Sequence, residues 1–235
     1  MKIFDLDSPL MTALSKVADL MLLNFLALIC CIPIFTAGAS LTALHYMVLK
    51  LARNEEGYIA RGFFKSFKQN FKQATIIWLM LLVMIVVLVL DFYIVLQSTS
   101  RFSLVLLVII LLVTVLVSFT ATFVFPVLAK FDNTIKSTIK NALMMSILQF
   151  PKTILMIIIN LVPIALVLLS FSMLPMLLLF GMSVPAYLSA LLYKKFFKKL
   201  EDQITGVDGS EEEEMAELNT EEDESSWEMF ANKGE

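Results

Sequence analysis

Histidine, cysteine and glycine are scarce in this sequence of 235 residues, which contains one histidine, two cysteines and seven glycines. The cysteines, Cys30 and Cys31, are adjacent in an apolar run, so the sequence has neither a disulfide framework nor a CxxC metal motif. His45 has no Cys, Asp or Glu close by in the sequence with which to form a zinc site or a catalytic triad. Glycine-rich phosphate loops, HExxH and GxSxG are also absent. We therefore predict a non-enzymatic protein without catalytic residues, metal sites or cofactors.

Charged residues are scarce as well. They make up 17% of the chain, hydrophobic residues make up 59%, and the mean hydropathy is +0.84. Soluble domains contain about 45–50% apolar and about 25% charged residues. The charge is also divided unevenly, because residues 1–200 carry 17 Lys and Arg against 7 Asp and Glu, whereas residues 201–235 carry one against 14. This composition predicts a basic membrane domain, residues 1–200, followed by an acidic tail, residues 201–235.

Long apolar runs predict an all-α, polytopic membrane helix bundle, since a helix needs about 20 apolar residues to cross a bilayer. Four runs are long enough: Ala74–Leu96, Phe102–Ala129, Thr153–Ser172 and Met173–Tyr193. The stretch Leu20–Leu49 contains a Pro-Gly-Ser turn region, and it predicts either one broken span or two, with Ser40 capping a helix from Leu41 to Arg53. Six spans place nearly all Lys and Arg on one side with both termini cytoplasmic, so we expect six rather than five.

Two basic segments between the spans predict amphipathic helices on the cytoplasmic side. In Gly62–Gln73, three phenylalanines share one helical face and three lysines lie largely on the other. These residues are Phe64, Phe67 and Phe71, and Lys65, Lys68 and Lys72. The pattern suits a helix lying among lipid headgroups, and it equally suits a helix that docks onto a protein partner.

The second segment, Asn133–Gln149, carries an apolar stripe and ends before Pro151. The stripe consists of Ile135, Ile139, Leu143 and Ile147. The order of span, basic helix and span therefore occurs twice, which indicates a weak internal repeat of the kind found in transporters. The acidic tail is expected to be disordered, and its apolar cluster of Trp227, Met229 and Phe230 is either a docking motif or without specific function.

Polar side chains inside the predicted spans are the candidates for a functional site. Asn24, His45, Tyr46 and Asn160 either line a solute pathway or provide hydrogen bonds between packed helices. The sequence leaves both interpretations open.

Two groups of motifs resemble the YesL family of bacterial membrane proteins. The first runs from Thr36-Ala37-Gly38-Ala39-Ser40 through Arg53-Asn54-Glu55-Glu56-Gly57-Tyr58 to Asn70-Phe71. The second contains Phe131-Asp132-Asn133, Lys140-Asn141 and Pro151. The motif residues to which the resemblance draws attention are Gly38, Ala39, Arg53, Gly57, Asn70, Asp132, Asn133, Lys140, Asn141 and Pro151.

This resemblance covers about residues 1–200 and implies a protein of the bacterial cell membrane. Genes of the family often neighbour those of carbohydrate ABC importers, which implies an accessory or regulatory component that contacts permease or ATPase subunits. The alternative is a small-solute transporter or permease-like subunit in its own right. We expect the lipid bilayer as a partner and no nucleic acid.

Overall fold

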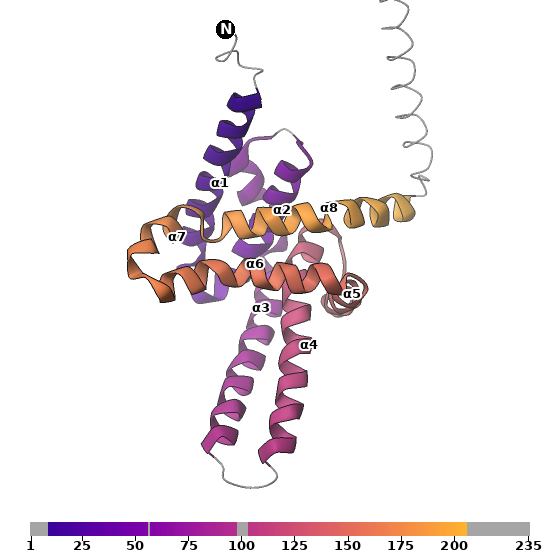
Figure 1. Cartoon of the computed structure of the whole chain (residues 1–235). Helices are drawn as coiled ribbons and strands as arrows, with labels where there is room; N and C mark the ends of the chain where they lie inside the picture. The colour runs from indigo at the N-terminus through magenta and orange to yellow at the C-terminus, as the bar shows by residue number, and fades with distance from the viewer. Residues whose placement is uncertain (1–8, 56, 98–102, 206–235) are drawn as a thin grey trace, which may run out of the picture. The chain divides into compact units, whose positions relative to one another are not determined.

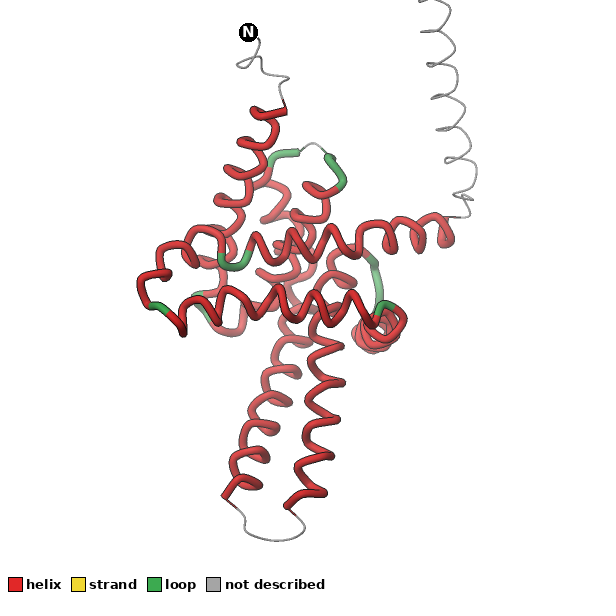
Figure 2. The backbone as a smooth tube through the Cα atoms, viewed as in Figure 1, coloured by secondary structure: helices red, strands yellow, loops and turns green. Residues whose placement is uncertain are grey.

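The computed structural model describes residues 9–55, 57–97 and 103–205, and Figures 1 and 2 show helices and connecting loops throughout these ranges. The all-α prediction is confirmed. The helices are α1 (Pro9–Cys31), α2 (Ala37–Ala52), α3 (Ile59–Gln97), α4 (Ser103–Lys130), α5 (Ile135–Leu148), α6 (Phe150–Leu169), α7 (Leu174–Phe180) and α8 (Ser183–Thr205), with short 3₁₀ helices at Ile34–Thr36 and Phe171–Met173. The chain forms two compact units, residues 1–192 and residues 193–235. Most of the predicted acidic tail lies outside the described residues.

Within the described ranges, five helices are long and apolar enough to cross a membrane, and a sixth span follows if the bent pair Phe171–Phe180 and Ser183–Gln203 is counted as one. The first apolar stretch supplies two of these spans, Ala13–Cys31 and Ile34–Ala52. The bend falls in the predicted last span instead, where α7 and α8 meet at 55°. By length and apolarity, five to six of the described helices are therefore suited to cross a membrane.

The helix α2 begins at Ala37, earlier than the predicted Leu41, and Ser40 is not its cap. Thr36 occupies the cap position, and its hydroxyl donates to the carbonyls of Cys30 and Pro33, at 2.6 and 2.7 Å. The Ser40 hydroxyl lies inside the helix, where it donates to the carbonyl of Ala27 on α1 at 2.9 Å. The prediction was wrong because Ser40 bonds across to a neighbouring helix rather than to its own N-terminus.

Close packing of α2 against α3 forms the centre of the first unit. A Cβ added to Gly38 would lie 2.5 Å from the Ala74 carbonyl oxygen and from the Trp78 Cβ, so the two backbones nearly touch there. At the other end, a Cβ on Gly62 would lie 2.5 Å from the Met47 sulfur. These two contacts show that α2 runs antiparallel to α3 beside residues 62–78. Small residues permit this close approach, as they commonly do between membrane helices.

The helix α3 is continuous over 39 residues. Residues 62–73 are helical as predicted, but they are the first part of α3 rather than a separate surface helix. No glycine or proline interrupts the sequence between Phe63 and Gln97, so no residue ends the helix where the lysine-rich segment meets the apolar one. At about 1.5 Å per residue, α3 extends over roughly 58 Å.

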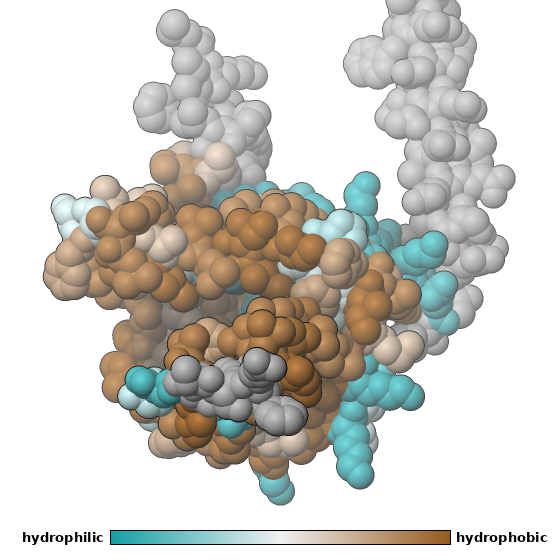
Figure 3. Space-filling model, turned by 60° about the horizontal axis from the view of Figure 1, so that its bottom comes forward, coloured by the Kyte–Doolittle hydropathy of each residue, from teal (hydrophilic) through white to brown (hydrophobic). Residues whose placement is uncertain are grey.

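The second half of α3 and the first half of α4 form a hairpin that extends away from α1 and α2 (Figure 1). Large apolar side chains along both helices are exposed, including Val83 and Val89 on α3 and Leu104 and Leu111 on α4, at 61%, 61%, 71% and 57%. Figure 3 looks onto the end of this hairpin and shows a surface dominated by hydrophobic residues. Such a surface suits hydrocarbon as the surrounding solvent, because soluble proteins rarely expose large contiguous apolar patches.

The helix α5 matches the predicted second amphipathic segment in extent but not in its packed face. Thr134 caps it by accepting from the backbone nitrogen of Ser137, at 3.4 Å. The buried residues are Thr138, Ala142 and Ser146, whereas Ile147 of the predicted stripe is 54% exposed. The other stripe residues, Ile135, Ile139 and Leu143, are partly buried, so the packed face is shifted from the predicted stripe toward the smaller side chains rather than lost.

The second described unit contains the end of α8, which extends to Thr205, beyond the predicted end of the last span at Tyr193. The rings of Tyr193 and Phe197 are 4.6 Å apart at their centroids. Residues Lys194–Lys199, which follow the predicted span, are therefore helical as well, since they contain no glycine or proline.

Candidate functional sites

The break between α7 and α8 is held by one side chain from α1. Asn24 is fully buried, and its amide nitrogen donates to the carbonyl of Leu178 at 2.7 Å and approaches that of Leu177 at 3.5 Å. Its carbonyl oxygen accepts from the backbone nitrogens of Met182 and Ser183, at 2.8 and 3.1 Å. A single carboxamide thus contacts the last turn of α7 and the first residue of α8 together.

Asn24 solves a specific problem of an interrupted helix. Each helix end exposes backbone groups without intrahelical partners, and such groups are costly to bury in an apolar environment. The carboxamide has both a donor and an acceptor, so it satisfies carbonyls on one side of the break and N–H groups on the other. The sequence indicated only that Asn24 was polar within a span, because its partners lie more than 150 positions away.

The other polar candidates lie at different places. Asn160 donates to the carbonyl of Met156 at 2.8 Å within α6 and approaches the Ser189 hydroxyl of α8 at 3.4 Å. His45 and Tyr46 are partly buried on α2, and the Tyr46 ring lies 5.7 Å from the Lys50 ammonium. Asn24 therefore contacts α8 at Ser183, its first residue, and Asn160 contacts α8 at Ser189. Both contacts are polar contacts between neighbouring helices. A pathway lined by these four residues stays a prediction.

In the first basic segment, Gly62–Gln73, the lysines lie on the exposed side of the helix, but the buried aromatic face differs from the predicted one. Lys65, Lys68 and Lys72 are exposed. Phe63 is fully buried, whereas Phe64 of the predicted aromatic face is 43% exposed. The Phe63 ring stacks on Phe67, which in turn contacts Phe71, with centroid distances of 6.3 and 5.5 Å.

Phe63 replaces Phe64 because α2 covers the side of α3 on which Phe63, Ser66 and Ala74 lie. Asn70 follows the same line and donates to the carbonyl of Ser66 at 3.1 Å. Periodicity in the sequence fits either phenylalanine, and only the position of α2 decides between them. The lysines are left on the opposite, exposed side of the helix.

The second basic segment, Asn133–Gln149, meets the first through one hydrogen bond. The Gln73 amide donates to the carbonyl of Asn133 at 2.5 Å, which joins α3 to the loop that precedes α5. Asp132 and Lys140 are exposed, and Asn141 approaches the Ser137 hydroxyl at 3.5 Å. The two predicted amphipathic segments, 60 positions apart in sequence, are thereby adjacent in the structure.

Several residues of the motifs have structural functions in the first unit. Gly38 permits the contact of α2 with α3, and Ala39 beside it is fully buried. Gly57 has open space around its Cα, so it meets no such requirement. Pro151 lies in the first turn of α6, where its missing N–H costs nothing.

Arg53 and its neighbours form a charged turn after α2. The Arg53 guanidinium and the Lys50 ammonium lie 3.8 and 3.7 Å from the carboxylate of Glu55. Asn54 adopts a left-handed conformation with φ 56°, and its side-chain oxygen accepts from the Lys16 ammonium of α1 at 2.6 Å. Asparagine tolerates this conformation better than most residues. The turn thereby ties the ends of α1 and α2 together.

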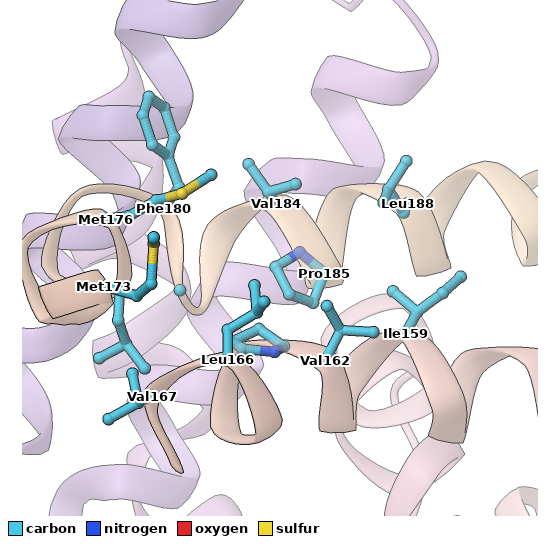
Figure 4. A pocket seen from close by; sticks show the side chains of 13 residues that line it. Ile159, Val162, Leu166, Val167, Met173, Met176, Phe180, Val184, Pro185 and Leu188 are labelled. Carbon is cyan, nitrogen blue, oxygen red and sulfur yellow. The ribbon is translucent and has the colours of Figure 1, made fainter. Parts of the chain in front are cut away.

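An apolar cavity of about 200 Å³ lies beside the helix break, between α6, α7 and α8. Figure 4 shows Val162 and Leu166 of α6 turned toward Pro185 of α8, with Met173 and Phe180 at one end. Among the described residues, no group of three or more His, Cys, Asp or Glu is placed to hold a metal ion. The residues that line the cavity are all apolar or glycine, so its wall presents hydrocarbon and thioether groups. It offers surface contact rather than reactive groups.

A family model described as "Protein of unknown function, DUF624" matches residues 20–92. The matched region contains the second half of α1, all of α2 and most of α3, and therefore the Gly38–Ala74 contact and the first basic segment. It includes the first group of motifs noted in the sequence, whereas the second group, at α5, lies outside it. No curated protein and no solved structure matches the chain.

Proposed function

We propose that this chain is a non-enzymatic accessory component of a carbohydrate ABC importer in the bacterial cell membrane. In this proposal, the two basic segments bind the importer's cytoplasm-facing subunits. The observation that carries it is the hydrogen bond from Gln73 to the Asn133 carbonyl, because it joins the end of one exposed basic segment to the start of the other.

Three features support this function. Five to six described helices are long and apolar enough to cross a bilayer, which suits a chain whose basic segments act at a membrane surface. Their lysines are exposed, which suits recognition of an acidic protein surface. The continuous α3 links the first segment directly to the membrane hairpin, so the binding region is held rigidly. Carbohydrate import itself rests on the resemblance to the YesL family, and cytoplasmic termini rest on the distribution of Lys and Arg.

Co-purification from native membranes tests the proposal. Solubilisation in mild detergent followed by mass spectrometry is expected to recover permease or ATPase subunits with the tagged chain. The triple variant K65Q/K68Q/K72Q is expected to lose at least about nine tenths of these partners, which corresponds to about 1.4 kcal/mol in binding.

A variant with an equal change of charge outside the two segments, K194Q/K195Q/K199Q, serves as the control and is expected to retain the partners. Equal retention by both triple variants would rule out the first basic segment as the binding site. Absence of any importer subunit from the wild-type preparation would overturn the function itself.

A small-solute transporter is the second candidate, and the break between α7 and α8 favours it, since interrupted membrane helices often mark transport sites. In such transporters the free backbone groups contact the solute, whereas here Asn24 occupies them. Transport would require this side chain to swing away. Purified protein in liposomes separates the two functions: sugar flux by the isolated chain supports a transporter, and flux only with importer subunits present supports the accessory function.

A further inference from the structure

The apolar cavity beside the helix break is continuous with the surface that faces hydrocarbon. Leu166 and Leu188 of its wall are 40% and 41% exposed, so the cavity opens at the protein surface. Three further residues of its wall, Val162, Met173 and Met176, are 46%, 42% and 57% exposed. In a bilayer these side chains contact acyl chains, and the opening of the cavity faces the same layer.

The backbone at the break does not make the cavity polar. The carbonyl of Leu178 and the N–H groups of Met182 and Ser183 bond to Asn24, which belongs to α1 and does not line the cavity. Gly181, which does line it, donates its N–H to the Leu177 carbonyl at 2.8 Å. The groups that would attract water are therefore used elsewhere, and the wall presents mainly carbon and sulfur.

A space of this size and chemistry takes hydrocarbon rather than water. An engineered cavity of about 150 Å³ lined by Leu, Ile and Phe stays dry and binds benzene. The present cavity, about 200 Å³, is larger and equally apolar. Empty apolar space is also unfavourable, because the lining atoms lose dispersion contacts.

We propose that this cavity binds the end of a phospholipid acyl chain from the surrounding bilayer. The phospholipid is the occupant because the exposed side chains around the opening place acyl chains directly beside it. The site is distinct from the basic segments, and this proposal does not depend on the importer partnership.

Photo-crosslinking tests the site. The full chain is reconstituted in vesicles of phosphatidylethanolamine and phosphatidylglycerol that contain a phospholipid with a diazirine at the end of one acyl chain. After illumination, mass spectrometry of peptides is expected to find adducts at Val162, Leu166 and Leu188. Lipid-facing Leu111 and Leu112 of α4, 57% and 59% exposed, provide the internal reference.

Two variants fill the cavity from different helices, Val162→Phe on α6 and Val184→Phe on α8. Each is expected to lower adducts at the remaining cavity residues at least about fivefold relative to Leu111 and Leu112. Val108→Phe, at a 50% exposed position of α4, is the matched control and is expected to leave the pattern unchanged.

A monodisperse size-exclusion profile and normal labelling of α4 show that each variant is folded. If one of the two filled variants does not fold, the other still tests the cavity. Unchanged cavity labelling in both filled variants would overturn the proposal. So would a wild-type cavity labelled no more than expected from its exposed fraction. Equal labelling by a phospholipid with the diazirine near its headgroup would also overturn it, because the adducts would then not come from the chain end.

Discussion

Asn24 and Met182 are joined by a hydrogen bond of 2.8 Å from the Met182 backbone nitrogen to the Asn24 side-chain oxygen, across 158 positions of sequence. The bond connects the first membrane helix to the interruption near the end of the bundle. The bend between α7 and α8 interrupts the backbone hydrogen bonds of a helix, and Asn24 binds the carbonyl and N–H groups that are left without helical partners. This side chain therefore stabilises the bend.

Replacing Asn24 is therefore expected to destabilise the protein. Asn24→Leu keeps a similar volume but leaves buried backbone groups unsatisfied, at about 1–3 kcal/mol. For a chain of this length, each kcal/mol lowers Tm by about 2–4 °C. The midpoint of thermal unfolding in detergent, followed by size-exclusion chromatography with fluorescence detection, measures this effect.

Thr114→Val is the control for Asn24→Leu, because Thr114 is exposed and bonds only to the Ile110 carbonyl of its own helix. Its Tm is expected to stay within about 2 °C of wild type, consistent with the small effect of exposed substitutions. A Tm for Asn24→Leu equal to that of Thr114→Val would show that the bonds at the break contribute nothing to stability.

The two motif glycines Gly38 and Gly57 predict opposite outcomes for one substitution. Gly38→Ala introduces a Cβ 2.5 Å from the Ala74 carbonyl oxygen, so α2 and α3 must separate. We expect a loss of about 1–3 kcal/mol, as for other overpacked sites. Gly57→Ala meets no atom within 4 Å and is expected to be neutral or slightly stabilising. Unfolding midpoints of the two variants, measured side by side, test the contrast.

The continuity of α3 is testable by distance. Spin labels at Lys68→Cys and Leu90→Cys, in a chain whose two cysteines are replaced by alanine, are separated by 22 residues and about 33 Å in an unbroken helix. A right-angled bend after Gln73 would shorten this separation to about 26 Å. Pulsed electron paramagnetic resonance in lipid measures the distance.

The label pair Leu79→Cys and Leu90→Cys calibrates this measurement. It lies within the apolar part of α3 and is expected at about 17 Å for either geometry. A distribution for the first pair centred near the shorter distance, with the second pair as expected, would contradict the continuous helix.

Trp78 reports where the α1–α2 turn lies relative to lipid. Its indole N–H donates to the Ile34 carbonyl at 2.8 Å, beside Ile32 and Phe35, which are 77% and 52% exposed. Tryptophan favours the boundary between hydrocarbon and water. In the variant Trp227→Phe, which leaves Trp78 as the only tryptophan, brominated lipids are expected to quench fluorescence most when bromine is near the headgroup. Strongest quenching by bromine at the chain end would place this turn deep in the bilayer instead.

The helices themselves could be predicted from the sequence because their signal is local. Apolar runs of about 20 residues specify spans wherever their partners lie. The helical period also placed Lys65, Lys68 and Lys72 on the face opposite the phenylalanines, and these side chains are exposed, as charged side chains usually are.

The packed faces and helix ends could not be predicted in the same way. Phe63 and Phe64 fit the helical period almost equally well, and only the course of α2 decides which is buried. Ser40 resembled a cap, yet its partner Ala27 belongs to another helix. The boundary expected at Gln73 was inferred from a change in composition, but a helix ends only where the backbone or its neighbours require it. The hydrogen bonds of Asn24 could not be predicted either, because they depend on the bend between α7 and α8, which no local sequence pattern indicates.

The uninterrupted course of α3 also has a mechanical consequence. A rod of 39 residues without an internal hinge after Phe63 behaves as a lever whose one arm bears lysines and whose other arm lies among apolar side chains. If a subunit binds the charged arm as proposed, we expect its force to change the tilt of the hairpin rather than to bend α3, because no glycine or proline offers a hinge between the two arms.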